Sequence, residues 1–537
     1  MKKLYFIFGI FFLATSAFGQ NITPGFLRGH LRFLADDLLE GRGPGTRGGE
    51  LATKYIASQL EALGVEPGNG TSYFQNVSMV GLTVERGQTM QLQKNGKKTL
   101  LNFGADFVAW TPSQQAEIKV QGELVFLGYG ITAPEFQWDD FKGTDLHGKI
   151  GLILVNDPPS EDPAFFEGKA MTYYGRWIYK LEEARRRGLL GAFVVHKLET
   201  AGYPWHVVEN SAGGEQFSLK ATVDTKYRMQ LAGWISSSTA EKMAELSGVS
   251  WPELEAKAKE KSFHPIPLGV TLETTLKSAM RSIESPNVVA IHRGSNPKLK
   301  DSYVLYCSHW DHLGIGKPNE KGDRIYNGAL DNASGVASLL ALAKAYSTIK
   351  TDRSVIFLFP TAEETGLLGS EYYVKHPLFP LEQTVGVINF DEVNVWGKTT
   401  DIFSLGNDRT TMENSVKKVA KKMKLSLGKD FFPEKGTFFR SDHWTFARMG
   451  IPATSVEFGQ NFVGKPEGWG MQKSKDFSAN HYHEPSDEVQ PDWDYSGTVQ
   501  HVEFALLLGL ELARSKNRPV WKDGRRAPQS ARFDEKD

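Results

Sequence analysis

The sequence contains only one cysteine, Cys307, in 537 residues, so no disulfide bond can form within the chain. A chain of this length can bury a stable core without disulfides, and it is long enough for more than one domain. Cys307 lies in an apolar run and is expected to be a small strand residue. No activating base is evident beside it apart from His309, which argues against a nucleophilic role.

An excess of charge is also absent, because the formal net charge is -1 at pH 7. This balance gives no argument for binding nucleic acid or an anionic membrane surface. Hydrophobic residues make up 40% and charged residues 23% of the chain, which is ordinary for a globular protein. The sequence does not reveal the oligomeric state.

Long apolar runs are lacking as well, and Leu4–Leu13 is too short for a transmembrane span. This run follows Lys2 and Lys3 and precedes Ala17-Phe18-Gly19, an arrangement typical of a secretory signal peptide. We therefore expect residues 1–19 to be removed on export. The mature protein would lie in the periplasm or outside the cell, without stable membrane insertion.

Polar side chains follow several apolar runs that are predicted to be buried strands. Such strand ends meet in one crevice of an open parallel sheet. Carboxylates gathered there repel one another unless a cation lies among them, and mixed His, Asp and Glu ligands suit zinc or a similar ion. The runs and the polar residues after them are Tyr303–Cys307 with His309 and Asp311, Ser354–Phe359 with Glu363 and Glu364, and Thr384–Phe390 with Asp391 and Glu392.

Helical patterns alternate with these strands. Asp331 precedes the Ala- and Leu-rich run Asn332–Tyr346, and this position predicts that Asp331 is the N-cap of a helix. Further helices are predicted at Ser370–His376, Thr411–Lys424 and Gly497–Ala513. The alternation predicts an α/β fold with a mostly parallel sheet and helices on both faces.

The rest of the chain divides into an N-terminal part, an insert and a tail. Residues 20–112 are expected to belong to the catalytic domain, and Leu27–Leu63 predicts two amphipathic helices around a glycine-rich turn. The insert, 113–275, carries none of the strand-end ligands, so we expect it to cover the site or to position substrate. The catalytic domain resumes over 276–514. The polar tail, 515–537, is expected to be poorly ordered.

In chain order, these motifs resemble the two-zinc exopeptidase family of secreted bacterial aminopeptidases and glutamate carboxypeptidases. Each motif is weak alone, but five in the same order are specific. The resemblance implies a mostly parallel mixed sheet flanked by helices. The insert, at His147–Ile150 and Gly188–Val195, resembles a β-rich protease-associated domain. The five motifs are His309-Trp310-Asp311, Asn327–Gly335, Ala362–Ser370, Asn389-Phe390-Asp391 and Tyr482–Asp487.

The resemblance implies a cofactor of two Zn2+ ions bridged by Asp331. His309 and Asp391 would complete the protein ligands of one ion, and Glu364 and His483 those of the other. Each ion would keep room for a shared water, as a catalytic zinc site requires.

The same resemblance assigns catalytic roles to three further residues. Glu363 would be the general base that takes the proton of the attacking water. Asp311 would orient His309 through the second ring nitrogen. Tyr482 would stabilise the oxyanion of the tetrahedral intermediate.

Neighbouring polar residues have competing interpretations. His312 and His481 could be ligands, but the motifs favour His309 and His483. Glu392 could bind a substrate amine, although a surface or hydrogen-bonding role is the simpler interpretation. Ser441-Asp442-His443 is too compact to form a catalytic triad and is expected to shape the rim of the pocket.

These observations predict an exported zinc exopeptidase, an aminopeptidase acting on peptides. A carboxypeptidase or dipeptidase would use the same chemistry, because specificity depends on pocket walls that motifs do not reveal. Glutaminyl cyclases use one zinc of a similar site, and receptor-like relatives have lost catalysis. Since none of the five expected ligands is missing here, a two-metal hydrolase is favoured over both.

Overall fold

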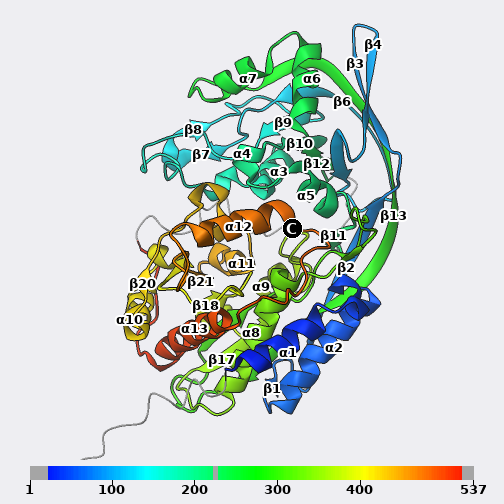
Figure 1. Cartoon of the computed structure of the whole chain (residues 1–537). Coiled ribbons are helices and arrows are strands. Elements are labelled where there is room, and N and C mark those ends of the chain that lie inside the picture. The colour runs from blue at the N-terminus through cyan, green and yellow to red at the C-terminus, as the bar shows by residue number, and fades with distance from the viewer. Residues whose placement is uncertain (1–21, 222–227, 523–537) are drawn as a thin grey trace, which may run out of the picture.

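The computed structural model describes residues 22–221 and 228–522. The expected signal peptide, 1–19, and the end of the tail lie outside these residues. None of the helices in the described part of the chain combines the length and the apolar character that a membrane span requires. The chain forms a lower body and an upper body, joined along one side by a long strand (Figure 1).

The centre of the lower body is a parallel array of the three strands predicted from apolar runs. Strand β14 lies between β17 and β18 and pairs with both in parallel, and β18 also pairs in parallel with β21. Antiparallel partners extend this array, because β13 pairs with β17, and β19 with β21. The predicted mixed sheet is therefore confirmed, with a parallel centre and antiparallel strands on both sides of it. Its strands are β1 (Glu66–Pro67), β2 (Phe74–Val84), β14 (Tyr303–Cys307), β17 (Ser354–Phe359), β18 (Thr384–Asn389), β19 (Asp401–Leu405), β20 (Ser426–Leu427) and β21 (Ala453–Phe458).

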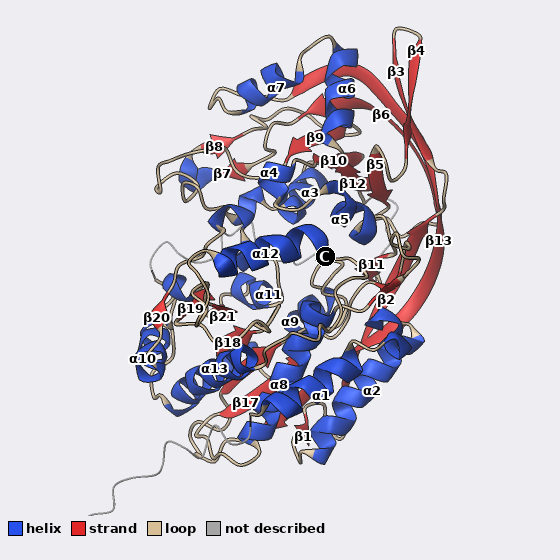
Figure 2. Cartoon of the chain, in the orientation of Figure 1, coloured by secondary structure: helices blue, strands red, loops and turns tan. Residues whose placement is uncertain are grey.

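Helices cover both faces of this sheet (Figure 2). Side chains alternate between the two faces of a strand, so Val304 and Tyr306 pack into one core cluster and Leu305 and Cys307 into another. The first cluster includes residues of α1, α2, α8, α10 and α13, and the second includes residues of α9 and α11. These helices are α1 (Pro24–Leu34), α2 (Arg47–Ala62), α8 (Ser334–Tyr346), α9 (Leu368–Lys375), α10 (Glu413–Met423), α11 (His443–Arg448) and α13 (Ser496–Arg514).

Strand β13 (Ile266–His292) belongs to both bodies and runs along the right side of Figure 1. Its first half pairs with β3 and β6 in the upper body, and its second half with β2 and β17 in the lower body. The upper sheet also takes in β3, β4 and β5, which precede residue 113. Its strands are β3 (Thr89–Lys94), β4 (Lys97–Asn102), β5 (Phe107–Trp110), β6 (Glu117–Phe126), β9 (Ile150–Leu154), β10 (Gly191–Val195) and β12 (Leu231–Ile235).

Short elements complete the two bodies. The helices of the upper body are α3 (Trp177–Arg186), α4 (Leu198–Ala201), α5 (Trp205–Ser211), α6 (Ser237–Ser247) and α7 (Trp251–Ala258). Helix α12 (Trp469–Asn480) lies between the two bodies in Figure 1. The remaining strands are β7 (Thr132–Ala133), β8 (Trp138–Asp139), β11 (Gln216–Leu219), β15 (Gly314–Ile315) and β16 (Ile325–Tyr326).

Two local expectations are wrong. Asp331 is not an N-cap, because a π-helical turn, Ala329–Ala333, precedes α8, and Asp331 has non-helical angles of φ -107° and ψ 93°. Its carboxylate is directed to histidines instead. The start of the polar tail is also ordered, since the indole of Trp521 donates a 2.7 Å hydrogen bond to the Gly450 carbonyl.

Candidate metal centre

The polar residues predicted to cluster are brought together at one edge of the parallel sheet. His309 follows β14, Glu363 and Glu364 follow β17, and Asp391 follows β18. His309 is almost completely buried, and the Asp391 side chain is the most accessible of the four at 25%. The sheet therefore places these ligand atoms at the floor of a crevice, as the strand ends predicted.

Asp331 lies at the centre of the cluster and turns its two carboxylate oxygens to different partners. Oδ1 is 3.4 Å from Nε2 of His309, which is also 3.4 Å from Oδ1 of Asp391. Oδ2 is 3.3 Å from Nε2 of His483, which lies 3.0 Å from Oε2 of Glu364. The five predicted ligands thus form two groups that share Asp331.

His312 belongs to the second group, although the sequence motifs favoured His483 alone. Its Nδ1 lies 2.6 Å from Oε1 of Glu364, and the pair converges with Asp331 in an arrangement that could hold an ion. The only signal in the sequence was its place directly after Asp311. His481 points elsewhere, because its Nδ1 lies 3.0 Å from the Ser486 hydroxyl.

The electrostatics of the cluster fit bound cations. Burial raises the pKa of Glu363 well above its ordinary value, and Asp391 adds to this. Burial also acts on His483, but Glu364 and Asp331 raise its pKa to about 10. Both ring nitrogens of His483 are buried without a hydrogen bond of normal geometry. A buried cluster with more carboxylates than histidines needs further positive charge, and nitrogen and oxygen donors of these types suit zinc.

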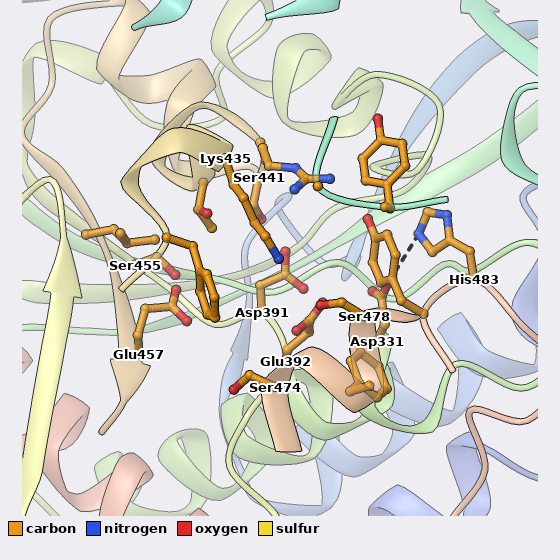
Figure 3. A pocket seen from close by; sticks show the side chains of 18 of the residues that line it. Asp331, Asp391, Glu392, Lys435, Ser441, Ser455, Glu457, Ser474, Ser478 and His483 are labelled. Atoms are coloured by element: carbon orange, nitrogen blue, oxygen red, sulfur yellow. Dashed lines mark ion pairs between the residues drawn. The ribbon is translucent and has the colours of Figure 1, made fainter. Parts of the chain in front are cut away.

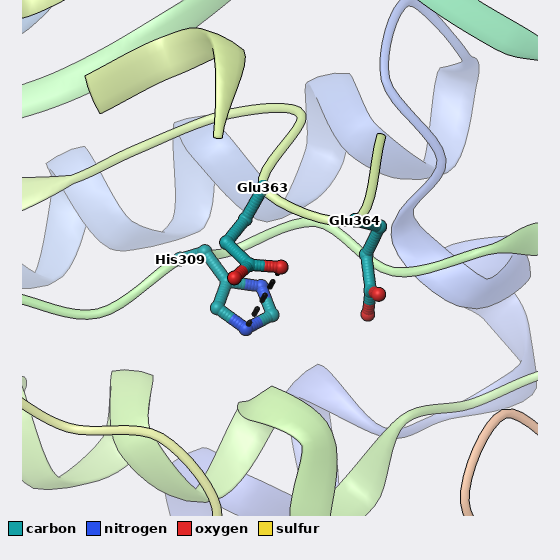
Figure 4. A group of neighbouring side chains, drawn as sticks. All are labelled: His309, Glu363 and Glu364. Atoms are coloured by element: carbon teal, nitrogen blue, oxygen red, sulfur yellow. Dashed lines mark ion pairs between the residues drawn. The ribbon is translucent and has the colours of Figure 1, made fainter. Parts of the chain in front are cut away.

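Glu363 shares the floor of the crevice with the ligands. Figure 4 shows its carboxylate beside the His309 ring, with the Glu364 carboxylate beyond. The distance from Glu363 Oε2 to His309 Nε2 is 4.0 Å. Glu363 therefore faces the same space as the ligands without making the short contacts that surround Asp331.

Asp311 contacts His309 through its main chain. Its carbonyl oxygen lies 3.2 Å from Nδ1 of His309, whereas its carboxylate Oδ1 is 3.8 Å away. The same Oδ1 accepts a 3.2 Å hydrogen bond from the Glu363 amide. The carboxylate therefore holds the loop that carries Glu363 rather than the imidazole.

Two buried residues without a predicted role, Asp487 at the end of the fifth motif and Arg42, support the ligand loops. Asp487 accepts hydrogen bonds from the amides of Leu330 and Asp331 at 2.9 and 3.0 Å. The guanidinium of Arg42 is completely buried and donates only to main-chain carbonyls. Its acceptors are Leu34 and Asn327 at 2.6 Å, Trp310 at 2.8 Å and Gly328 at 3.0 Å.

The ligand cluster forms one end of a pocket of about 260 Å³ between the two bodies. The Tyr482 ring stacks on His483 with centroids 3.9 Å apart and lines the pocket. Glu392 also lines the pocket, and Figure 3 shows it close to Asp391. Cations also line it, namely Arg440 and Lys435 of the lower body and Arg176 of the upper body. No sequence motif pointed to these cations, although Arg440 directly precedes Ser441-Asp442-His443.

Ser441-Asp442-His443 does not form a triad. The Ser441 hydroxyl accepts a 2.9 Å hydrogen bond from the Asn389 amide, and neither ring nitrogen of His443 has a hydrogen-bond partner within the described structure. Burial lowers the pKa of His443 to about 3. Ser441 and His443 line the pocket, so the motif shapes its wall.

The upper body contacts the ligand loop and the lower body directly. Asn210 donates to the His483 carbonyl at 3.2 Å and to Glu484 Oε1 at 2.8 Å. Arg448 of the lower body pairs with Glu182 at 3.0 Å.

Comparisons with known proteins relate the part of the chain that carries these ligands to one peptidase family. Residues 287–507 match the model of peptidase family M28. The chain is 28% identical over 227 residues to aminopeptidase YwaD of Bacillus subtilis, covering 41% of this chain and 43% of the relative. It is 29% identical over 231 residues to a probable leucine aminopeptidase 2 of Aspergillus oryzae, with the same coverage. The chain thus spans less than half the length of these curated relatives.

A solved structure extends the similarity in fold to the whole chain. The aminopeptidase from Aneurinibacillus sp. strain AM-1 superposes with a TM-score of 0.54 at 19% identity, covering 94% of this chain and 97% of that one. The match over residues 287–507 relates this part of the chain to peptidase family M28, and the chain shares the overall fold of this aminopeptidase.

Proposed function

We propose that this protein is a two-zinc aminopeptidase that removes N-terminal residues from peptides. The main observation behind the proposal is the position of the Asp331 carboxylate. One of its oxygens faces His309 and the other faces His483. The names of the relatives, both aminopeptidases, agree with it.

His309, Asp331 and Asp391 would hold one ion, and Asp331, Glu364 and His483 the other. When bound, the two ions would polarise the scissile carbonyl and lower the pKa of a water molecule. His312 would hold Glu364 in position, or serve as a ligand itself, through the contact at 2.6 Å.

The remaining steps belong to residues of the chain. Glu363 would accept the proton of the water and pass it to the leaving amine, and the Asp311 carboxylate would fix the Glu363 loop. The Tyr482 hydroxyl would donate a hydrogen bond to the developing oxyanion. Glu392 lines the pocket beside Asp391 and would bind the substrate ammonium.

A dipeptidase is the second candidate, and the arginines of the pocket favour it. Arg176 and Arg440 come from different bodies, line the pocket and form no ion pair within the described residues. The Nε of Arg176 is buried without a hydrogen-bond partner. Guanidinium groups suit carboxylates, so this pair could bind the free C-terminus of a very short peptide.

We also propose that the upper body is a protease-associated-type domain that covers the site and positions substrate. Its Arg176 and Tyr203 line the pocket, and its Asn210 contacts the His483 loop. Export through residues 1–19 to the periplasm or the cell exterior completes the proposal. N-terminal sequencing of the mature protein should begin at Gln20.

One experiment separates these functions. The mature protein is incubated with free-amine, N-acetylated and C-amidated peptides, with and without a metal chelator. An aminopeptidase cleaves the free-amine and C-amidated peptides but not the N-acetylated peptide, and the chelator abolishes its activity. A dipeptidase rejects the C-amidated peptide, and chelator-resistant cleavage would contradict metal catalysis.

A further inference from the structure

The wall of the pocket formed by β19 and β21 carries a carboxylate. Glu457 is paired with Phe403 across the antiparallel ladder, and Ser455 is paired with Leu405. All four residues line the pocket. Figure 3 shows Glu457 and Ser455 together on this wall, with Asp331 and His483 on the other side of the view.

The surfaces beside Glu457 are apolar. The pocket is also lined by Phe403, Phe432, Phe458, Leu405 and Trp396. Trp396 packs edge-on against Phe458, with ring centroids 5.5 Å apart. A carboxylate among aromatic side chains suits a long aliphatic stem that ends in a cation.

The charged groups around the Glu457 carboxylate are acidic rather than basic. No cation of the described residues forms an ion pair with it. The charged groups that act most strongly on Glu457 are the carboxylates of Asp391, Glu392 and Asp430. Burial raises its pKa well above the ordinary value, and these neighbours add to the rise.

The cations of the pocket are directed elsewhere. Arg440 and Lys435 both act on Glu392, and Figure 3 shows the Lys435 amine directed toward Asp391. Ser455 is 1% exposed, and its hydroxyl lies near Glu457 without a hydrogen bond of normal geometry. Glu457 therefore has the Ser455 hydroxyl beside it but no cationic partner among the described residues, so its carboxylate can accept a charged donor from the substrate.

We propose that Glu457 makes the enzyme select peptides with a basic N-terminal residue, lysine or arginine, whose cation it binds with the help of Ser455. The inference rests on the proposed aminopeptidase function. The aromatic wall would hold the aliphatic part of the side chain, while Glu392 binds the α-ammonium. Lysine and norleucine differ only in the terminal amine, so they isolate the contribution of the charge.

The test compares kcat/KM for p-nitroanilides of Lys, Arg, norleucine, Leu and Glu. We expect Lys and Arg to exceed norleucine by about ten- to hundredfold, the range of one charged hydrogen bond. Glu457→Gln should remove most of this preference and keep activity on norleucine. Glu457→Lys should favour the Glu substrate over the Lys substrate. The matched control is Glu434→Gln, an exposed residue of the neighbouring loop, and it should behave as wild type.

Binding gives a second measurement that does not depend on turnover. Calorimetry is done with the Glu363→Gln variant, in which turnover is expected to be strongly reduced. This variant should bind L-lysinamide more tightly than L-norleucinamide, and adding Glu457→Gln to it should abolish the difference in affinity. A wild type that prefers Leu or norleucine, with no change in Glu457→Gln, would overturn the inference and leave the aminopeptidase function standing. If none of the anilides is cleaved, the proposed function is wrong. If, in addition, the two amides bind equally well, the inference about Glu457 is wrong too.

Discussion

The Nδ1 atom of His312 lies 2.6 Å from Oε1 of Glu364, whose other oxygen is 3.0 Å from Nε2 of His483. Glu364 is thus held from both sides by imidazoles. We expect His312→Ala to weaken the affinity of the second metal site by about ten- to hundredfold, as loss of a residue that orients a ligand usually does. Zinc titration followed by competition with a chelator measures this.

A rescue variant separates the hydrogen bond from other effects of His312. Asn places an amide donor near the position of Nδ1, so His312→Asn should restore most of the affinity. His481→Ala is the control, because that ring contacts Ser486 and not Glu364. Unchanged affinity in His312→Ala would show that His483 alone holds Glu364 well enough.

Arg42 connects the N-terminal segment to two ligand loops through its buried guanidinium. Replacement with Lys keeps the charge but loses the planar set of donors, so carbonyls of Trp310 and Gly328 would lose their partner. We expect Arg42→Lys to lower the free energy of unfolding by about 3 kcal/mol. Arg47→Lys, with a side chain 71% exposed, should change it little. Denaturant unfolding measures both, and equal midpoints would contradict the role of Arg42.

The apolar runs predicted β14 and β17 with the observed bounds, because fully buried parallel strands read as continuous hydrophobic segments. The strand ends also predicted which carboxylates converge. The N-cap assigned to Asp331 is wrong because its carboxylate is used by His309 and His483, a tertiary requirement that local propensity does not contain.

Other features depend on contacts between distant segments. His312 Nδ1 reaches Glu364 only after β14 and β17 pair. Arg176 lines the pocket only because the upper body lies over the sheet. The length of β13 could not be predicted from the sequence, because one continuous strand belongs to two sheets. No change in the local residue pattern marks the point where the two bodies meet.

His501 predicts a dependence of stability on pH. Burial lowers its pKa to about 4, from 6.5 in the unfolded chain, while Nε2 lies 2.9 Å from the Val456 carbonyl. Between these values the unfolded state binds more protons, so stability falls as the pH drops from about 6.5 to about 4. The contribution reaches about 3 kcal/mol.

His501→Gln should reduce this loss of stability on acidification, even if it lowers stability at pH 7. The measurement is denaturant unfolding of both proteins at pH 7 and pH 5. His264→Gln, which changes an exposed residue, is the control. Parallel curves of stability against pH for wild type and His501→Gln would contradict the assignment.

Glu363 and Glu364 are adjacent but have different proposed duties. Glu363→Gln keeps the size of the side chain and removes the base, so we expect it to bind metal normally and to lose at least about a hundredfold in kcat. Metal content and steady-state kinetics are measured together, with Glu382→Gln, an exposed residue, as the control. Near-normal kcat would refute the general base, and loss of metal would instead make Glu363 a ligand.

The zinc content of Asp331→Ala is the most direct test of a shared two-metal site, because Asp331 belongs to both groups of proposed ligands. After zinc loading and dialysis, elemental analysis should find up to two ions per chain in the wild type. We predict that Asp331→Ala holds at most one weakly bound ion and has lost peptidase activity. Retention of two ions by the variant would contradict the shared site.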